Sequence, residues 1–181
     1  LYVDRAGLLW VGTLTSGLRV LDPETREIQH IAVETLEKYA SNQASSGILK
    51  ITEDLFGTLW IGSYGAGVSF LDREDRSQMN FRRLESSIFK LTDPRRSPIK
   101  DIWEDSNGLL WLASYGAGVI RFDRRTNEFQ QFKHELNNPL SLSHDRTNAI
   151  FTDRSGNLWV GTASGLSLSL IHISEPTRPT P

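Results

Sequence analysis

One pattern of three residue types recurs four times along the 181-residue chain and limits what the chain can fold into. Each copy has an aspartate, a glycine three residues later and a tryptophan three residues after that. The aspartates are Asp4, Asp54, Asp105 and Asp153, the glycines are Gly7, Gly57, Gly108 and Gly156, and the tryptophans are Trp10, Trp60, Trp111 and Trp159. Successive tryptophans lie 50, 51 and 48 residues apart. Constant internal spacing with variable connections is typical of a structural repeat.

Each unit contains short apolar stretches separated by turn signals. In the second unit these are "ILKITED", "TLWIGS", "GVSFLD" and "NFRRLES", whose β-branched and aromatic residues favour strands. In each Asp-x-x-Gly turn the aspartate can accept backbone N–H bonds and the glycine can adopt a positive φ. Turns this short connect antiparallel strands. Only residues 33–43, "VETLEKYASNQ", have helical spacing.

Four antiparallel strands repeated about every 50 residues predict an all-β fold, a partial β-propeller of about three and a half four-stranded blades. A flat β array or a sandwich is the alternative. The tryptophan shared by all copies predicts a common packing site, in which each unit buries its indole against a neighbouring unit.

The sequence also resembles a known family. The pattern Asp-x-x-Gly-x-Leu-Trp, followed by Gly-Leu or Gly-Val and a closing aspartate, is similar to the two-component regulator propeller repeat over residues 1–166. The resemblance implies the periplasmic sensor part of a hybrid histidine kinase, anchored in the inner membrane, which recognises an oligosaccharide or another small molecule and passes the signal to a phosphorelay. It also implies further blades in the same chain and a homodimer at full length.

Residues 167–181 do not follow the repeat. Position 171 is Ile where the pattern would place an aspartate, and a proline-rich stretch follows. Residues 168–178, "LSLIHISEPTR", resemble the translation of a transposase adapter used in sequencing libraries. We therefore expect residues 1–166 to be a partial propeller, with incomplete first and last copies, and residues 167–181 to be a non-native tail. A divergent terminus is the alternative, and the alternating "LSLSL" segment remains able to pair as a strand.

Catalytic chemistry finds little support in the residues. Two carboxylates across a gap can hydrolyse glycosides, but these aspartates recur before a turn glycine in every unit, which favours a structural role. The histidines lack metal-ligand spacing, and the sequence contains neither a Gly-x-Ser-x-Gly elbow nor a phosphate-binding loop. The sequence predicts no catalytic residue, cofactor or metal. Streptogramin-lyase-like propellers share a similar Gly-x-x-Trp strand, so a fragment of a propeller lyase or glycan hydrolase is the alternative function.

Charge and composition exclude other partners. A net charge of −2 gives no electrostatic basis for binding nucleic acid or an anionic membrane. No apolar run approaches the length of a membrane span. Cysteine is absent, which excludes disulfides and thiolate metal sites and is compatible with an oxidising compartment.

The stretch "SYGAG" occurs twice, at residues 63–67 and 114–118. Its glycines fit a turn, but its tyrosines are not needed for one, because the first and fourth copies have Leu14 and Ala163 there. In a four-stranded meander this turn lies on the face opposite the Asp-x-x-Gly turns. A tyrosine can stack on a sugar ring, and loops on a rigid scaffold often carry function. The sequence therefore predicts Tyr64 and Tyr115 as ligand contacts.

Overall fold

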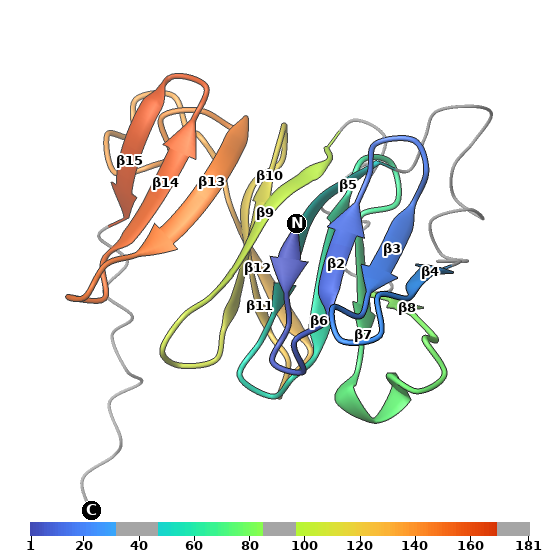
Figure 1. Cartoon of the computed structure of the whole chain (residues 1–181). Helices are drawn as coiled ribbons and strands as arrows, with labels where there is room; N and C mark the ends of the chain where they lie inside the picture. Colours follow the sequence, from blue (N-terminus) through green and yellow to red (C-terminus); the bar gives the residue numbers. More distant parts are fainter. Residues whose placement is uncertain (32–46, 85–96, 170–181) are drawn as a thin grey trace, which may run out of the picture.

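The computed structural model describes residues 1–31, 47–84 and 97–169, which form four separate antiparallel sheets (Figure 1). Each sheet corresponds to one copy of the repeat, and its strands follow one another in chain order. The sheets, called blades 1–4 below, confirm the prediction of four-stranded antiparallel propeller blades. The segment with helical spacing, residues 33–43, lies outside the described residues, as do residues 170–181.

The strands of the first two blades are β1 Tyr2–Val3, β2 Leu9–Gly12, β3 Leu18–Leu21 and β4 Ile28–Ile31, then β5 Ile48–Glu53, β6 Leu59–Ser63, β7 Val68–Leu71 and β8 Arg82–Arg83. Those of the last two blades are β9 Ile99–Glu104, β10 Leu110–Ser114, β11 Gly118–Asp123 and β12 Glu128–Phe132, then β13 Thr147–Thr152, β14 Leu158–Thr162 and β15 Gly165–Ser169.

Helical structure is limited to one short 3-10 turn, η1 Arg73–Asp75, within the three described ranges. In this part of the chain no helix has the length and apolar character needed to cross a membrane. The segment "LSLSL" does pair as a strand, because β15 follows β14 as far as Ser169. Blade 4 has three strands among the described residues.

The blades approach one another along their first strands. β5 packs beside β9, and β9 packs beside β13, so these three strands form the inner side of the array. Each carries a β-bulge near its start, because Leu49, Lys100 and Asn148 have no partner in the registers of their hairpins. A bulge of this kind bends a strand and re-aims a side chain.

The meander places the turns on two opposite faces. The Asp-x-x-Gly turns and the turns after the third strands lie on one face, here called the turn face. The turns after the second strands, including both "SYGAG" stretches, lie with the connections between blades on the other, here called the link face. The four Asp-x-x-Gly glycines have φ between 75° and 86°, a range that L side chains rarely adopt, so the predicted turn chemistry is confirmed.

The core consists of layers between blades, and each layer is centred on a tryptophan. Trp10, Trp60 and Trp111 are at most 2% exposed, and each packs against apolar side chains of the following blade. Trp159 is only half-buried, because no described blade follows blade 4. The glycine two residues after Trp60 allows close contact: a Cβ at Gly62 would lie 2.9 Å from the Ile99 carbonyl oxygen of the next blade. The predicted burial of the repeated tryptophan between blades is confirmed for the first three copies.

Candidate functional site

On the turn face, one aspartate side chain organises each blade. Its Oδ1 accepts backbone N–H bonds from the second and fourth residues after it, at 2.8–3.1 Å. Its Oδ2 accepts the indole N–H of the tryptophan six residues later, at 2.7–2.9 Å. The aspartate therefore ties the turn to the buried tryptophan. The constant spacing of six residues in the sequence reflects this second bond, which sequence reasoning missed.

The next blade contributes an arginine to the same carboxylate at two junctions. Arg76 of blade 2 lies 2.6 Å from Asp4 Oδ2 and also pairs with Glu53 at 2.8 Å. Arg124 of blade 3 pairs with Asp54 and donates to the Thr58 hydroxyl at 3.1 Å. These arginines follow the closing aspartate of their blade by four residues and one residue, so their spacing is irregular. The irregular spacing explains why the repeat pattern did not reveal them.

A glutamate at the end of the first strand adds a second link between blades. Glu53 Oε2 accepts the Arg5 backbone N–H of blade 1 at 2.9 Å, and Glu104 Oε2 accepts the Leu55 N–H of blade 2 at 2.6 Å. The second and third copies have a glutamate directly before the repeated aspartate. This Glu-Asp pair indicates a contact between blades only when the neighbouring blade is known. The turn face is therefore a series of inter-blade contacts in which the turn aspartates and at least one oxygen of each glutamate accept donors, an arrangement suited to stability. Within the described ranges, Glu104 Oε1 is buried and accepts no hydrogen bond.

Glu104 makes one of these contacts sensitive to pH. Burial raises the pKa of its carboxyl, the Leu55 N–H opposes this, and the negative charge of Asp54 adds to it. Because the folded pKa is raised, this contribution to stability is present below the usual glutamate pKa and is lost as pH rises through the raised value. We expect Glu104→Gln, which can still accept the Leu55 N–H, to reduce the fall in unfolding free energy as pH rises above the usual glutamate pKa of about 4.3. Urea denaturation at a series of pH values above that pKa measures it. Glu128→Gln on β12 is the matched control, and an unchanged pH profile in Glu104→Gln would contradict the prediction.

On the link face, the two copies of "SYGAG" differ in environment. Tyr64 is 46% exposed, and its backbone N–H donates to the Gly47 carbonyl at 2.7 Å. Within the described ranges, no ring or cation packs on its side chain. Tyr115 is half-buried, and two cations, Lys100 and Arg146, lie near its ring. The structure therefore does not bring the two predicted ligand contacts into one equivalent setting: cations lie near the Tyr115 ring, and among the described residues none lies over the Tyr64 ring.

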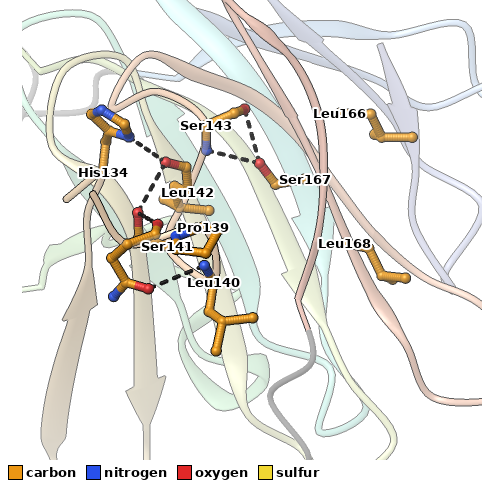
Figure 2. A pocket seen from close by; sticks show the side chains of 10 residues that line it. His134, Pro139, Leu140, Ser141, Leu142, Ser143, Leu166, Ser167 and Leu168 are labelled. Carbon is orange, nitrogen blue, oxygen red and sulfur yellow. Dashed lines mark hydrogen bonds between the residues drawn. The ribbon is translucent and has the colours of Figure 1, made fainter. Parts of the chain in front are cut away.

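A cavity of about 360 Å³ lies where the connection between blades 3 and 4 passes strand β15 (Figure 2). Figure 2 shows the side chains of Ser143 and Ser167 meeting at its edge, where their hydroxyls hydrogen bond at 2.9 Å. His134 is exposed and donates its Nδ1–H to the Leu142 carbonyl at 2.6 Å. The polar lining is thus largely paired within the protein. His144 is half-buried beside this connection, and its Nδ1 accepts the Arg146 backbone N–H at 2.9 Å.

The described residues contain no group of three histidine, cysteine, aspartate or glutamate side chains able to hold a metal ion. His30 lies on the exposed outer strand of blade 1, with Nε2 3.1 Å from the Ser16 carbonyl oxygen. His172 falls outside the described residues. The repeated aspartates are each in a separate blade and already occupied by donors, so none is paired with another as acid and base.

Comparison with known proteins agrees with the repeat. Residues 141–164, which include Asp153, Gly156 and Trp159, match the family described as two component regulator propeller. The chain is 29% identical over 77 residues to Histidine kinase P4 of Formosa agariphila, a match that covers 42% of this chain and 6% of that protein.

Solved structures share the fold. The extracellular domain of the hybrid two component system BT4673 from B. thetaiotaomicron superposes with a TM-score of 0.72 at 24% identity, over 92% of this chain and 20% of that one. Virginiamycin B lyase from Staphylococcus aureus superposes with a TM-score of 0.64 at 15% identity, over 100% of this chain and 55% of the lyase. At these identities the likeness establishes a propeller architecture and carries no chemistry from the lyase.

The chain spans about a fifth of the BT4673 extracellular domain and a much smaller part of the kinase it matches. The matched segment contains the fourth copy of the pattern, and the other three copies share its aspartate, glycine, tryptophan and hydrogen bonds. The chain is therefore a β-propeller segment in which residues 141–164 match the two component regulator propeller family and the other three copies share the pattern of that segment.

Proposed function

We propose that this chain is part of the ligand-sensing propeller of a hybrid histidine kinase that lies in the periplasm and is anchored in the inner membrane by segments outside it. The observation that carries the proposal is the repeat, whose fourth copy matches the two component regulator propeller family at residues 141–164. The 29% identity with a histidine kinase over 77 residues supports it. The chain supplies no reaction in this scheme. A bound ligand would bias the geometry of a homodimer, and the kinase would convert that bias into a phosphorelay.

The ligand we propose is an oligosaccharide bound on the link face. Support comes from Tyr64, which is 46% exposed and lies in the turn that connects the core strands β6 and β7. The turn is rigid, because the Ser63 hydroxyl and backbone N–H both bond to the Gly67 carbonyl at 3.0 Å. An aromatic face presented this way can stack on a sugar ring, and the phenol hydroxyl can bond to its hydroxyls. The turn face offers less, since its polar groups already bridge the blades.

We expect Tyr64→Ala to weaken oligosaccharide binding about threefold to tenfold, because an aromatic contact of this kind contributes roughly 0.5–1.5 kcal/mol. The melting temperature should change little, since the residue is 46% exposed and belongs to none of the core clusters of the described residues. Isothermal titration of the complete protein with individual tetrasaccharides released from complex glycans measures the affinity. Phe56→Ala is the matched control, because Phe56 is an exposed aromatic on the turn face at 64% exposure. Equal losses in both variants would contradict a link-face site.

Incubation of the complete protein with the same tetrasaccharides distinguishes a sensor from an enzyme. After prolonged incubation with the complete protein, we expect the bound oligosaccharide to be recovered unchanged by chromatography. Shortened or unsaturated products would instead establish a propeller hydrolase or lyase.

A further inference from the structure

Two cations lie near the Tyr115 ring, and no carboxylate among the described residues pairs with either of them. The Lys100 Nζ lies 5.5 Å and the Arg146 Cζ 5.4 Å from the centroid of its ring. Both distances are within the range in which a cation is attracted to an aromatic face. Neither cation forms an ion pair within the described part of the chain. Two like charges that each lie within 5.5 Å of one ring centroid repel each other, so an anion bound by one or both of them would stabilise the arrangement.

Backbone pairing positions the two residues that carry these cations. Lys100 is the bulged residue of β9, with no partner in the register with β10. Arg146 is bridged to Tyr115, and its carbonyl accepts the Ala163 N–H at 2.9 Å. The Tyr115 N–H in turn donates to the Pro98 carbonyl at 2.9 Å. The two charges are therefore presented by neighbouring blades at the link-face end of the inner strands, where β9 packs beside β13.

Local charge points to an anionic ligand even though the whole chain carries a net charge of −2. The nearby Asp101 does not neutralise this pair, because its Oδ1 binds Lys50 at 2.8 Å and its Oδ2 accepts the Ile150 N–H at 2.9 Å. Asp145 Oδ1 accepts the His134 backbone N–H at 2.7 Å. Neither of these carboxylates is paired with Lys100 or Arg146 within the described ranges.

We propose that Lys100 and Arg146 bind the carboxylate or sulfate group of an acidic oligosaccharide. The planar guanidinium can donate two parallel bonds to such a group, and the ammonium acts as a point charge beside it. Tyr115 is a positioning residue in this site, because its ring orients the two cations. The inference rests on the proposed oligosaccharide-sensing function and specifies the chemical class of its ligand.

Three tetrasaccharides test the inference by titration of the complete protein: tetragalacturonate, which carries carboxylates, a carrageenan tetrasaccharide, which carries sulfates, and neutral cellotetraose. We expect at least one acidic probe to bind, more weakly as salt rises. Arg146→Gln should raise the dissociation constant for that probe about tenfold, as expected for losing a bond between charged groups. Lys100→Gln should raise it severalfold. Arg19→Gln is the matched control, since Arg19 is exposed on β3 of blade 1 and should bind as wild type does.

A fourth probe, inorganic sulfate, separates the anion site from sugar recognition. Its binding should shift the NMR signals of the Arg146 side chain in the Arg19→Gln variant and in wild type, and should shift no arginine signal in Arg146→Gln. Sulfate binding without any tetrasaccharide binding would support the anion site and overturn the oligosaccharide function. Binding of cellotetraose that equals or exceeds that of the acidic probes would overturn the anion site and leave the sensing function standing. Failure of all four probes would overturn both.

Discussion

Replacing Asp54 with alanine is expected to destabilise the protein by about 3–5 kcal/mol, the usual cost of removing one partner from a buried ion pair. The Asp54 side chain is buried and accepts four donors: the backbone N–H groups of Phe56 and Thr58, the indole of Trp60, and Arg124 from the next blade. Without the carboxylate, a partly buried guanidinium and a buried indole N–H lose their acceptor. The loss therefore exceeds the value of about 1 kcal/mol typical of a side chain that only caps a turn.

Asp153→Ala is the matched control for this result. Asp153 makes the same turn bonds and the same indole bond at 2.9 Å, but it receives no arginine from another blade among the described residues. Urea denaturation should therefore show a clearly smaller loss for Asp153→Ala than for Asp54→Ala. Equal losses would mean that the turn itself, and not the junction between blades, determines the cost.

A double-mutant cycle isolates the contribution of the arginine. Once Asp54 is absent, Arg124→Ala should cost much less than it does in wild type, which gives a coupling energy of about 1–3 kcal/mol between the two residues. A coupling near zero would show that Arg124 stabilises the protein through its contacts with Phe56 and Trp60, over whose rings it lies at 5.3 Å and 5.4 Å.

The repeat made the blade predictable because its signals are local. The aspartate, glycine and tryptophan of each copy lie within six residues, so one turn and one strand settle their geometry. Contacts between blades, in contrast, join residues that are far apart in the sequence. Arg76 and Asp4 are 72 residues apart, and nothing in the spacing of either copy indicates that they meet. They became visible only when the fold placed successive blades side by side.

The same distinction explains the two tyrosines. Sequence alone treats Tyr64 and Tyr115 alike, since the five residues around them are identical. Their described environments differ: the Tyr115 ring has Arg146, which directly precedes β13, and Lys100, the bulged residue of β9, near it. In the preceding blade the bulged residue is Leu49, which is apolar. An identical motif can therefore have different neighbours in two blades: two cations lie near the Tyr115 ring, and no cation lies over the Tyr64 ring within the described ranges.

The repeated tryptophan offers the second large effect, because its burial depends on the blade that follows. Trp60 is 1% exposed and packs on Phe70 of its own blade, with ring centroids 5.1 Å apart, and on Phe122 of blade 3 at 6.2 Å. Trp60→Ala leaves a large cavity in this layer, so we expect it to lower the unfolding free energy by about 3–5 kcal/mol. Trp60→Phe keeps most of the ring and removes the indole N–H, so it should cost less than Trp60→Ala.

A comparison with Trp159 distinguishes the stability that comes from packing against the next blade from the stability that the tryptophan gives to its own blade. Trp159 occupies the same place in its blade and donates to Asp153 as Trp60 does to Asp54, yet it is only half-buried. If packing between blades is the main source of stability, Trp159→Ala should lower the unfolding free energy clearly less than Trp60→Ala does in the same protein. Urea denaturation of both variants measures the difference. Equal costs at the two positions would mean that the tryptophan stabilises its own hairpin, through the bond to the turn aspartate, and that the layer between blades adds little.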